Sequence, residues 1–95
     1  MSDVQNDLEP VRELIDSVDA EILQLLKHRS LLVDQVIAIK KDAKATPHQP
    51  DRFAKMMDRL HELAEQEGVE QQLVDEIWDA IHHSSMRQQA KELEK

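Results

Sequence analysis

The chain has 95 residues, so it forms one domain at most, and a domain of this size buries little core without a partner chain. It contains no cysteine, which excludes disulfides and thiol chemistry, and its net charge of -8 excludes a general surface for nucleic acids or anionic membranes. The first ten residues are polar and acidic, and no apolar run approaches the roughly 18 residues of a membrane span, so we expect a cytoplasmic protein. Abundant Leu, Ala, Glu, Gln and Lys favour helix throughout, and we expect no sheet.

A seven-residue rhythm of apolar residues predicts a first helix over about residues 7–44. Two registers show this rhythm, and nine of their ten positions are apolar, Arg29 being the exception. The first register consists of Leu8, Ile15, Ile22, Arg29 and Val36, and the second of Val11, Val18, Leu25, Leu32 and Ile39. Pro10 fits the first turn, where its missing N–H breaks no hydrogen bond. Such a helix spans roughly 54 Å, which one small chain cannot cover. We therefore expect an intertwined antiparallel homodimer, with a monomeric three-helix bundle as the alternative.

A second helix is predicted over residues 50–67. Pro50 and Asp51 are typical of a helix start, and Gly68 is typical of a residue that ends a helix. The residues expected to face inward are Phe53, Met56, Met57, Leu60, Leu63 and Ala64.

A third helix is predicted over residues 70–90, followed by a charged tail that we expect to fray. Its apolar face consists of Leu73, Val74, Ile77, Trp78 and Ile81. The three helices together predict a single all-α domain over residues 1–95.

Arg29 interrupts the apolar stripe of the first helix. Its neighbours at helical spacing are apolar, so no carboxylate on the same helix can pair with it. A buried guanidinium without a partner would cost several kcal/mol, so a group outside the helix must neutralise it. That group is either an acid of another helix or an anionic ligand. Lys40 also lacks an acid at helical spacing.

The inward stripe of the third helix turns polar at its end, because Ser85 and Gln89 follow Ile77 and Ile81 at four-residue steps. These two residues either face the interior or belong to a frayed helix end. Arg52 lies near the start of the second helix, where anions are favoured. Taken together, the cations and amides predict a pocket for a small dicarboxylate. A reaction that needs only positioning and charge stabilisation could run there.

Other kinds of chemistry have no candidates in the sequence. His82 and His83 are adjacent and point apart on a helix, so we expect no metal site. We also find no nucleophile beside a base and no glycine-rich phosphate loop. Arg12 has Glu9 and Asp16 within one turn, which is typical of a surface ion pair.

These residues resemble the all-helical (type II) chorismate mutases, with which the chain aligns without gaps from about Leu8 to Gln89. The motifs that carry the resemblance are VRELIDSVDAEILQLLKHRSLLVDQVIAIK, PDR and SSMRQQ. The resemblance implies an intertwined dimer with two sites that rearrange chorismate to prephenate without a cofactor.

The resemblance also implies a role for each polar residue of the site. Arg12 would reach one substrate carboxylate from the partner chain, and Arg29 would hold the enolpyruvyl carboxylate. Lys40 and Gln89 would donate hydrogen bonds to the ether oxygen. The remaining anion contacts would come from Arg52 and Ser85. Arg12 and Lys40 are 28 residues apart, roughly 42 Å along a helix, so only an antiparallel partner can bring them together.

Two positions differ from the mutase pattern. Phe53 stands where bacterial mutases commonly have a glutamate for the ring hydroxyl, and Gln49 occupies a loop position that is often acidic. The related isochorismate-pyruvate lyases tend to be apolar at the position of Phe53, and isochorismate has no C4 hydroxyl. A lyase that forms salicylate and pyruvate, or a mutase for 4-amino-4-deoxychorismate, is therefore an alternative. A helical protein-interaction module is the alternative without enzyme activity.

Overall fold

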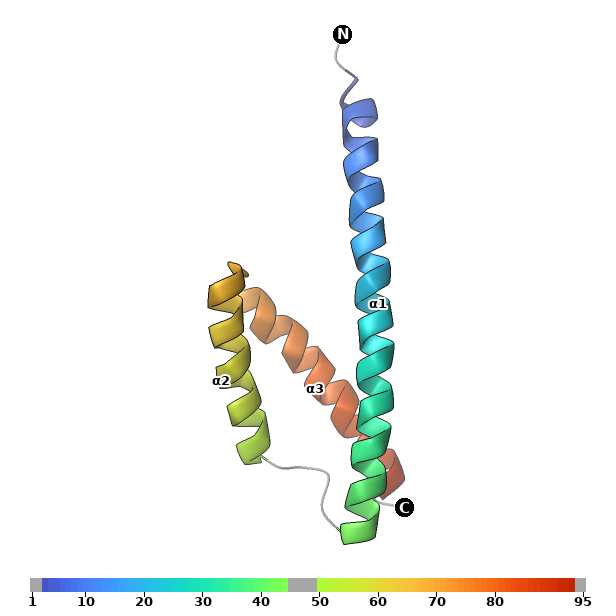
Figure 1. The fold of residues 1–95 in the computed structure, drawn as a ribbon, viewed down its shortest axis with the longest axis vertical. Coiled ribbons are helices and arrows are strands. Elements are labelled where there is room, and N and C mark those ends of the chain that lie inside the picture. Colours follow the sequence, from blue (N-terminus) through green and yellow to red (C-terminus); the bar gives the residue numbers. More distant parts are fainter. Residues whose placement is uncertain (1–2, 45–49, 94–95) are drawn as a thin grey trace. The chain divides into compact units, whose positions relative to one another are not determined.

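The computed structural model describes residues 3–44 and 50–93, and this part of the chain is helical with no strand. Helix α1 spans Val4–Ala43, α2 spans Pro50–Glu67 and α3 spans Gln71–Leu93 (Figure 1). The predicted all-α fold with one long N-terminal helix is confirmed. None of the described helices is both long and apolar enough to cross a lipid bilayer.

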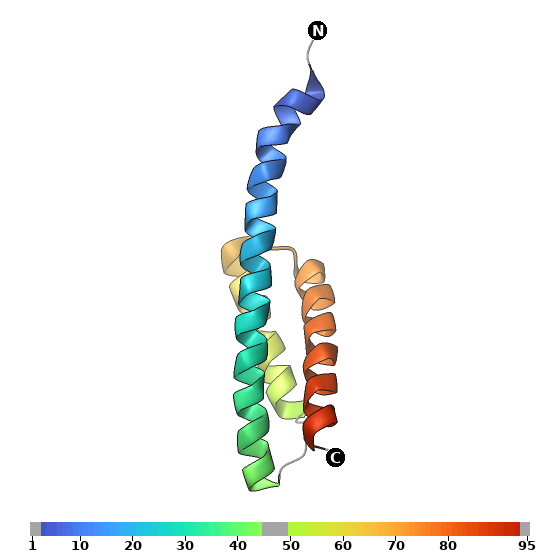
Figure 2. The same ribbon diagram turned by 90° about the vertical axis from the view of Figure 1, so that its right-hand side faces the viewer.

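Asp3 sets the start of α1, which is earlier than the apolar rhythm predicts. Its Oδ1 atom accepts hydrogen bonds from the backbone N–H groups of Gln5 at 3.1 Å and Asn6 at 3.3 Å. An N-cap side chain satisfies first-turn N–H groups in this way. Pro10 consequently lies inside the helix, so its predicted place in the first turn is wrong. Proline removes one helical hydrogen bond, and the first turns of α1 bend (Figure 2).

Gly68 ends α2, as the sequence predicts. Its φ angle is 73°, in the left-handed region that glycine adopts without strain. The N–H of Val69 donates to the carbonyl of Ala64 at 2.8 Å, and the N–H of Gly68 donates to the carbonyl of Glu65 at 3.3 Å. This pair of bonds closes a helix at a left-handed residue. The short connection leads into α3, which packs against α2 (Figure 1).

The chain divides into two units, Met1–Leu32 and Val33–Lys95. The described part of the first unit is the N-terminal portion of α1. Its apolar residues are largely uncovered, with exposed fractions of 53% for Val11 and 65% for Leu25. We call the set of Val11, Ile15, Val18, Ile22 and Leu25 the α1 stripe. A single helix cannot bury its own apolar face, so burial of this stripe requires another helix.

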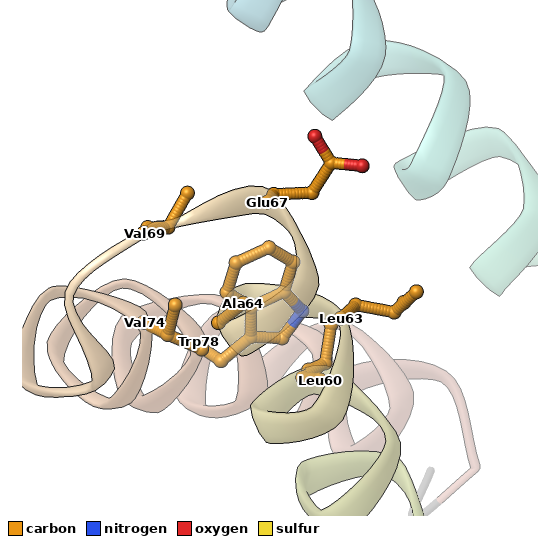
Figure 3. Close-up of a pocket in the computed structure, with 7 residues that line it drawn as sticks. All are labelled: Leu60, Leu63, Ala64, Glu67, Val69, Val74 and Trp78. Atoms are coloured by element: carbon orange, nitrogen blue, oxygen red, sulfur yellow. The ribbon is translucent and has the colours of Figure 1, made fainter.

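The second unit contains the last turns of α1 together with α2 and α3. Its buried apolar side chains are Ile37, Met56, Ala64 and Val74. Near their connection, α2 and α3 line an apolar pocket of about 230 Å³, in which Trp78 lies beside residues of α2 (Figure 3). The pocket is lined by Leu60, Leu63, Ala64, Glu67, Val69, Val74 and Trp78. None of these residues is a cation, so this pocket is not the predicted dicarboxylate site.

Candidate active site

Lys40 and Gln89 meet within the second unit, although 49 residues separate them in the sequence. Lys40 lies in the last turn of α1, and its Nζ atom donates a hydrogen bond to Oε1 of Gln89 on α3 at 2.6 Å. Gln89 is only 8% exposed and is the buried polar residue of the described part of the chain. The structure therefore brings together two residues that sequence analysis assigned to one site from separate helices.

Burial changes the electrostatics of this contact. Loss of surrounding water lowers the pKa of Lys40 below its ordinary value of 10.5. The amide oxygen of Gln89 accepts a hydrogen bond but brings no negative charge. An anion beside the ammonium would favour its charged form and raise the pKa again. The pair is therefore suited to stabilise negative charge that develops on a ligand oxygen.

The contact also orients the side-chain amide of Gln89. An ammonium group only donates hydrogen bonds, so the amide turns its oxygen toward Lys40. The NH2 group is then the end of the amide that can donate to a ligand. The site thus offers two donors from two helices, Nζ of Lys40 and Nε2 of Gln89.

Contacts on both sides of Gln89 link α3 to the end of α1. Nε2 of Gln88 donates to Oδ1 of Asp34 at 2.8 Å, and Nζ of Lys41 lies 3.6 Å from Oε2 of Glu92. Exposed contacts of this kind add little stability one by one, but together they restrict how α3 can rotate beside α1. Glu92 lies beyond the predicted end of the third helix at residue 90. The tail does not fray there, because α3 continues to Leu93.

His82 and Ser85 lie on the same face of α3 as Gln89, since residues at i, i+3 and i+7 share a helix face. Both are half-buried. Sequence analysis selected Ser85 but missed His82, which it considered only as a metal ligand. The spacing of three and seven residues was the available signal. The four-residue steps from Ile77 to Gln89 mark the same face but do not include His82.

Phe53 and His82 connect α2 to this face of α3. Their ring centroids are 4.1 Å apart and their planes are tilted by 35°. Phe53 is half-buried, whereas its neighbour Arg52 is exposed in the first turn of α2. Gln49, the other predicted site residue of this region, lies outside the described residues.

Arg12 and Arg29 belong to the first unit. Arg12 is exposed, and its Nη1 donates to Oε1 of Gln5 at 3.0 Å. Sequence spacing had suggested Glu9 and Asp16 as its partners instead. Arg29 is half-buried. The grouping of these two arginines with the residues of the second unit stays a prediction.

Comparison with known proteins identifies a family and relatives of this chain. The family model described as chorismate mutase type II matches residues 11–90. A chorismate mutase from Methanocaldococcus jannaschii is 26% identical over 84 residues, which cover 86% of this chain and 85% of that protein. An isochorismate pyruvate lyase from Pseudomonas aeruginosa is 31% identical over 84 residues, which cover 88% of this chain and 82% of that protein. No solved structure matches the chain significantly.

The matched residues 11–90 include parts of all three helices, and Lys40, Gln89, Phe53 and His82 lie among them. It also covers most of the chain, so it does not depend on a single motif. The chain belongs to the chorismate mutase type II family.

Proposed function

We propose that the chain is an enzyme that rearranges chorismate to prephenate. In this reaction the ether C–O bond breaks while a C–C bond forms in the same molecule, so no proton, electron or water has to be supplied. The enzyme needs only to hold the folded substrate and to stabilise charge on the departing ether oxygen. The observation that carries the proposal is the partly buried hydrogen bond between Lys40 and Gln89.

Lys40 and Gln89 are the catalytic residues of this proposal. As the C–O bond breaks, negative charge collects on the ether oxygen, and Nζ of Lys40 and Nε2 of Gln89 donate to it. Because Lys40 already holds the amide by its oxygen, the Nε2 donor is oriented before the substrate arrives. Donors that need no reorganisation stabilise the transition state more than the ground state.

Arg29 joins this catalytic group by binding the carboxylate of the enolpyruvyl group, whose methylene carbon forms the new C–C bond. The other residues that would bind the dianionic substrate are Arg12, Gln49, Arg52, Phe53 and Ser85. Guanidinium groups suit this role, because each can hold a carboxylate through two parallel hydrogen bonds. Phe53 would form an apolar wall of the pocket.

The active form in this proposal is a homodimer in which Arg12 enters the site of the partner chain. The exposed α1 stripe supports it, since an amphipathic helix of this length needs a second helix to cover its apolar face. An antiparallel arrangement would bring the Arg12 end of one α1 to the Lys40 end of the other.

An isochorismate-pyruvate lyase is the second candidate, and Phe53 favours it. A phenylalanine cannot accept a hydrogen bond from the C4 hydroxyl of chorismate, whereas isochorismate carries no hydroxyl at that carbon. The relative from Pseudomonas aeruginosa is named as such a lyase. The same two donors would serve in this reaction, because it too breaks the ether C–O bond.

Product analysis separates the candidates. Purified protein is incubated with chorismate, isochorismate or 4-amino-4-deoxychorismate, without added metal or cofactor. We expect conversion of chorismate to prephenate; formation of salicylate and pyruvate from isochorismate alone would replace this assignment with the lyase. If no substrate is consumed and a bicyclic diacid mimic of the transition state leaves the melting temperature unchanged, the enzyme proposal is wrong and a helical interaction module remains.

A further inference from the structure

The site contains a histidine to which no role has been assigned. His82 lies three residues before Ser85 and seven before Gln89 on the same face of α3. The rise of a helix places His82 and Gln89 about 10 Å apart along α3, with Ser85 between them. Because helical side chains lean toward the N-terminus, the long side chain of Gln89 reaches back in the direction of His82. One small ligand can therefore contact both residues.

Phe53 determines where the imidazole of His82 lies. The two ring centroids are 4.1 Å apart, so the imidazole lies directly beside the side chain at position 53. Both residues are half-buried, and stacking restricts the rotation of both rings. The imidazole thus lies beside a side chain that has no hydrogen-bonding group of its own.

The chemistry of imidazole fits the task that Phe53 cannot perform. A neutral imidazole has one nitrogen that donates and one that accepts a hydrogen bond, so it can bind a hydroxyl group in either sense. It does so without adding a negative charge to a pocket that must hold two carboxylates.

We propose that His82 is a specificity-determining residue that hydrogen-bonds the C4 hydroxyl of chorismate. This inference rests on the proposed mutase function and names the group that recognises the substrate ring. Phe53 then positions the imidazole through the contact between the two rings.

The adjacent histidine provides a matched control. The side chain of His83 is 63% exposed, and its Nδ1 atom lies 3.5 Å from Oδ2 of Asp79 on the same helix. It is therefore largely in contact with solvent, and we place it outside the proposed site. His83→Leu should leave the activity unchanged.

The test compares chorismate with an analogue that carries hydrogen in place of the C4 hydroxyl. For the wild type, kcat/KM should be about 10-fold to 100-fold higher for chorismate than for the analogue, the range expected for a buried polar group left without its partner. His82→Leu should lower kcat/KM for chorismate by a similar factor and change it less than about threefold for the analogue. His82→Gln, which keeps an acceptor, should recover most of the preference.

Melting temperatures of all variants show whether they fold. Equal losses on both substrates in His82→Leu, or equal turnover of both substrates by the wild type, would overturn the role of His82 while leaving the mutase function intact. A wild-type protein that does not convert chorismate overturns both assignments. The preference of the wild type is measured without any variant, so the inference can be refuted even if His82→Leu does not fold.

Discussion

Replacement of Gln89 by leucine is the sharpest test of the proposed mechanism. Gln89 is 8% exposed, and leucine fills most of the same buried space. The substitution removes the oxygen that accepts the Lys40 hydrogen bond and also the Nε2 donor. Loss of one preorganised donor to a developing oxyanion costs about 2.7–4 kcal/mol, or about 100-fold to 1,000-fold in kcat. The free energy of unfolding should fall by only about 1 kcal/mol, because Lys40 is partly exposed and its ammonium can turn to water.

Steady-state kinetics with chorismate measures kcat and KM separately. We expect the loss to lie in kcat, with KM changed less than about threefold, because the Nε2 bond strengthens at the transition state. The matched control is Gln88→Leu, which removes the 2.8 Å contact with Asp34 but no proposed donor, and it should retain full activity. A kcat for Gln89→Leu within about threefold of the wild type, or a loss confined to KM, would refute the reasoning.

Three further predictions concern other features of the chain. Because burial lowers the pKa of Lys40, kcat/KM should decline as pH rises through a value below 10.5, and Lys40→Arg should move that decline to higher pH. A pH profile without this decline would contradict protonated Lys40 as a donor. Gly68→Ala should lower the free energy of unfolding by about 1 kcal/mol in urea denaturation, since an added Cβ meets no atom within 4 Å but the φ of 73° is strained for alanine. Mixing inactive Arg12→Ala and Gln89→Leu chains under conditions of subunit exchange should restore about a quarter of wild-type activity, because half of the dimers regain one intact site. No recovery after confirmed exchange would argue that Arg12 acts within its own chain.

The helices could be predicted from the sequence because their signals are local. The heptad rhythm identified α1, and Gly68 identified the end of α2 through the one backbone conformation that favours glycine. The apolar rhythm predicts too late a start for α1, because the helix begins at the cap formed by the carboxylate of Asp3. The continuation of α3 to Leu93 was also missed. A charged tail has no apolar signal, and Glu92 pairs with a residue of another helix.

The site was only partly predictable for a related reason. Lys40 and Gln89 were each identified by their place on an apolar face, but their contact joins residues 49 positions apart and depends on how two helices pack. The stacking of Phe53 on His82 is likewise a contact between helices. Periodicity within one helix specifies which residues share a face, and it does not specify what that face meets.

The uncovered α1 stripe has a consequence for the order in which the protein folds. In the second unit α2 and α3 pack against each other within one chain. They can therefore form in a step whose rate is independent of protein concentration. In proteins most of the stability of an amphipathic helix comes from packing of its apolar face, so residues 4–32 become persistently helical only on encounter with a second helix. If that second helix comes from another molecule, the slow phase of refolding accelerates as the protein concentration increases.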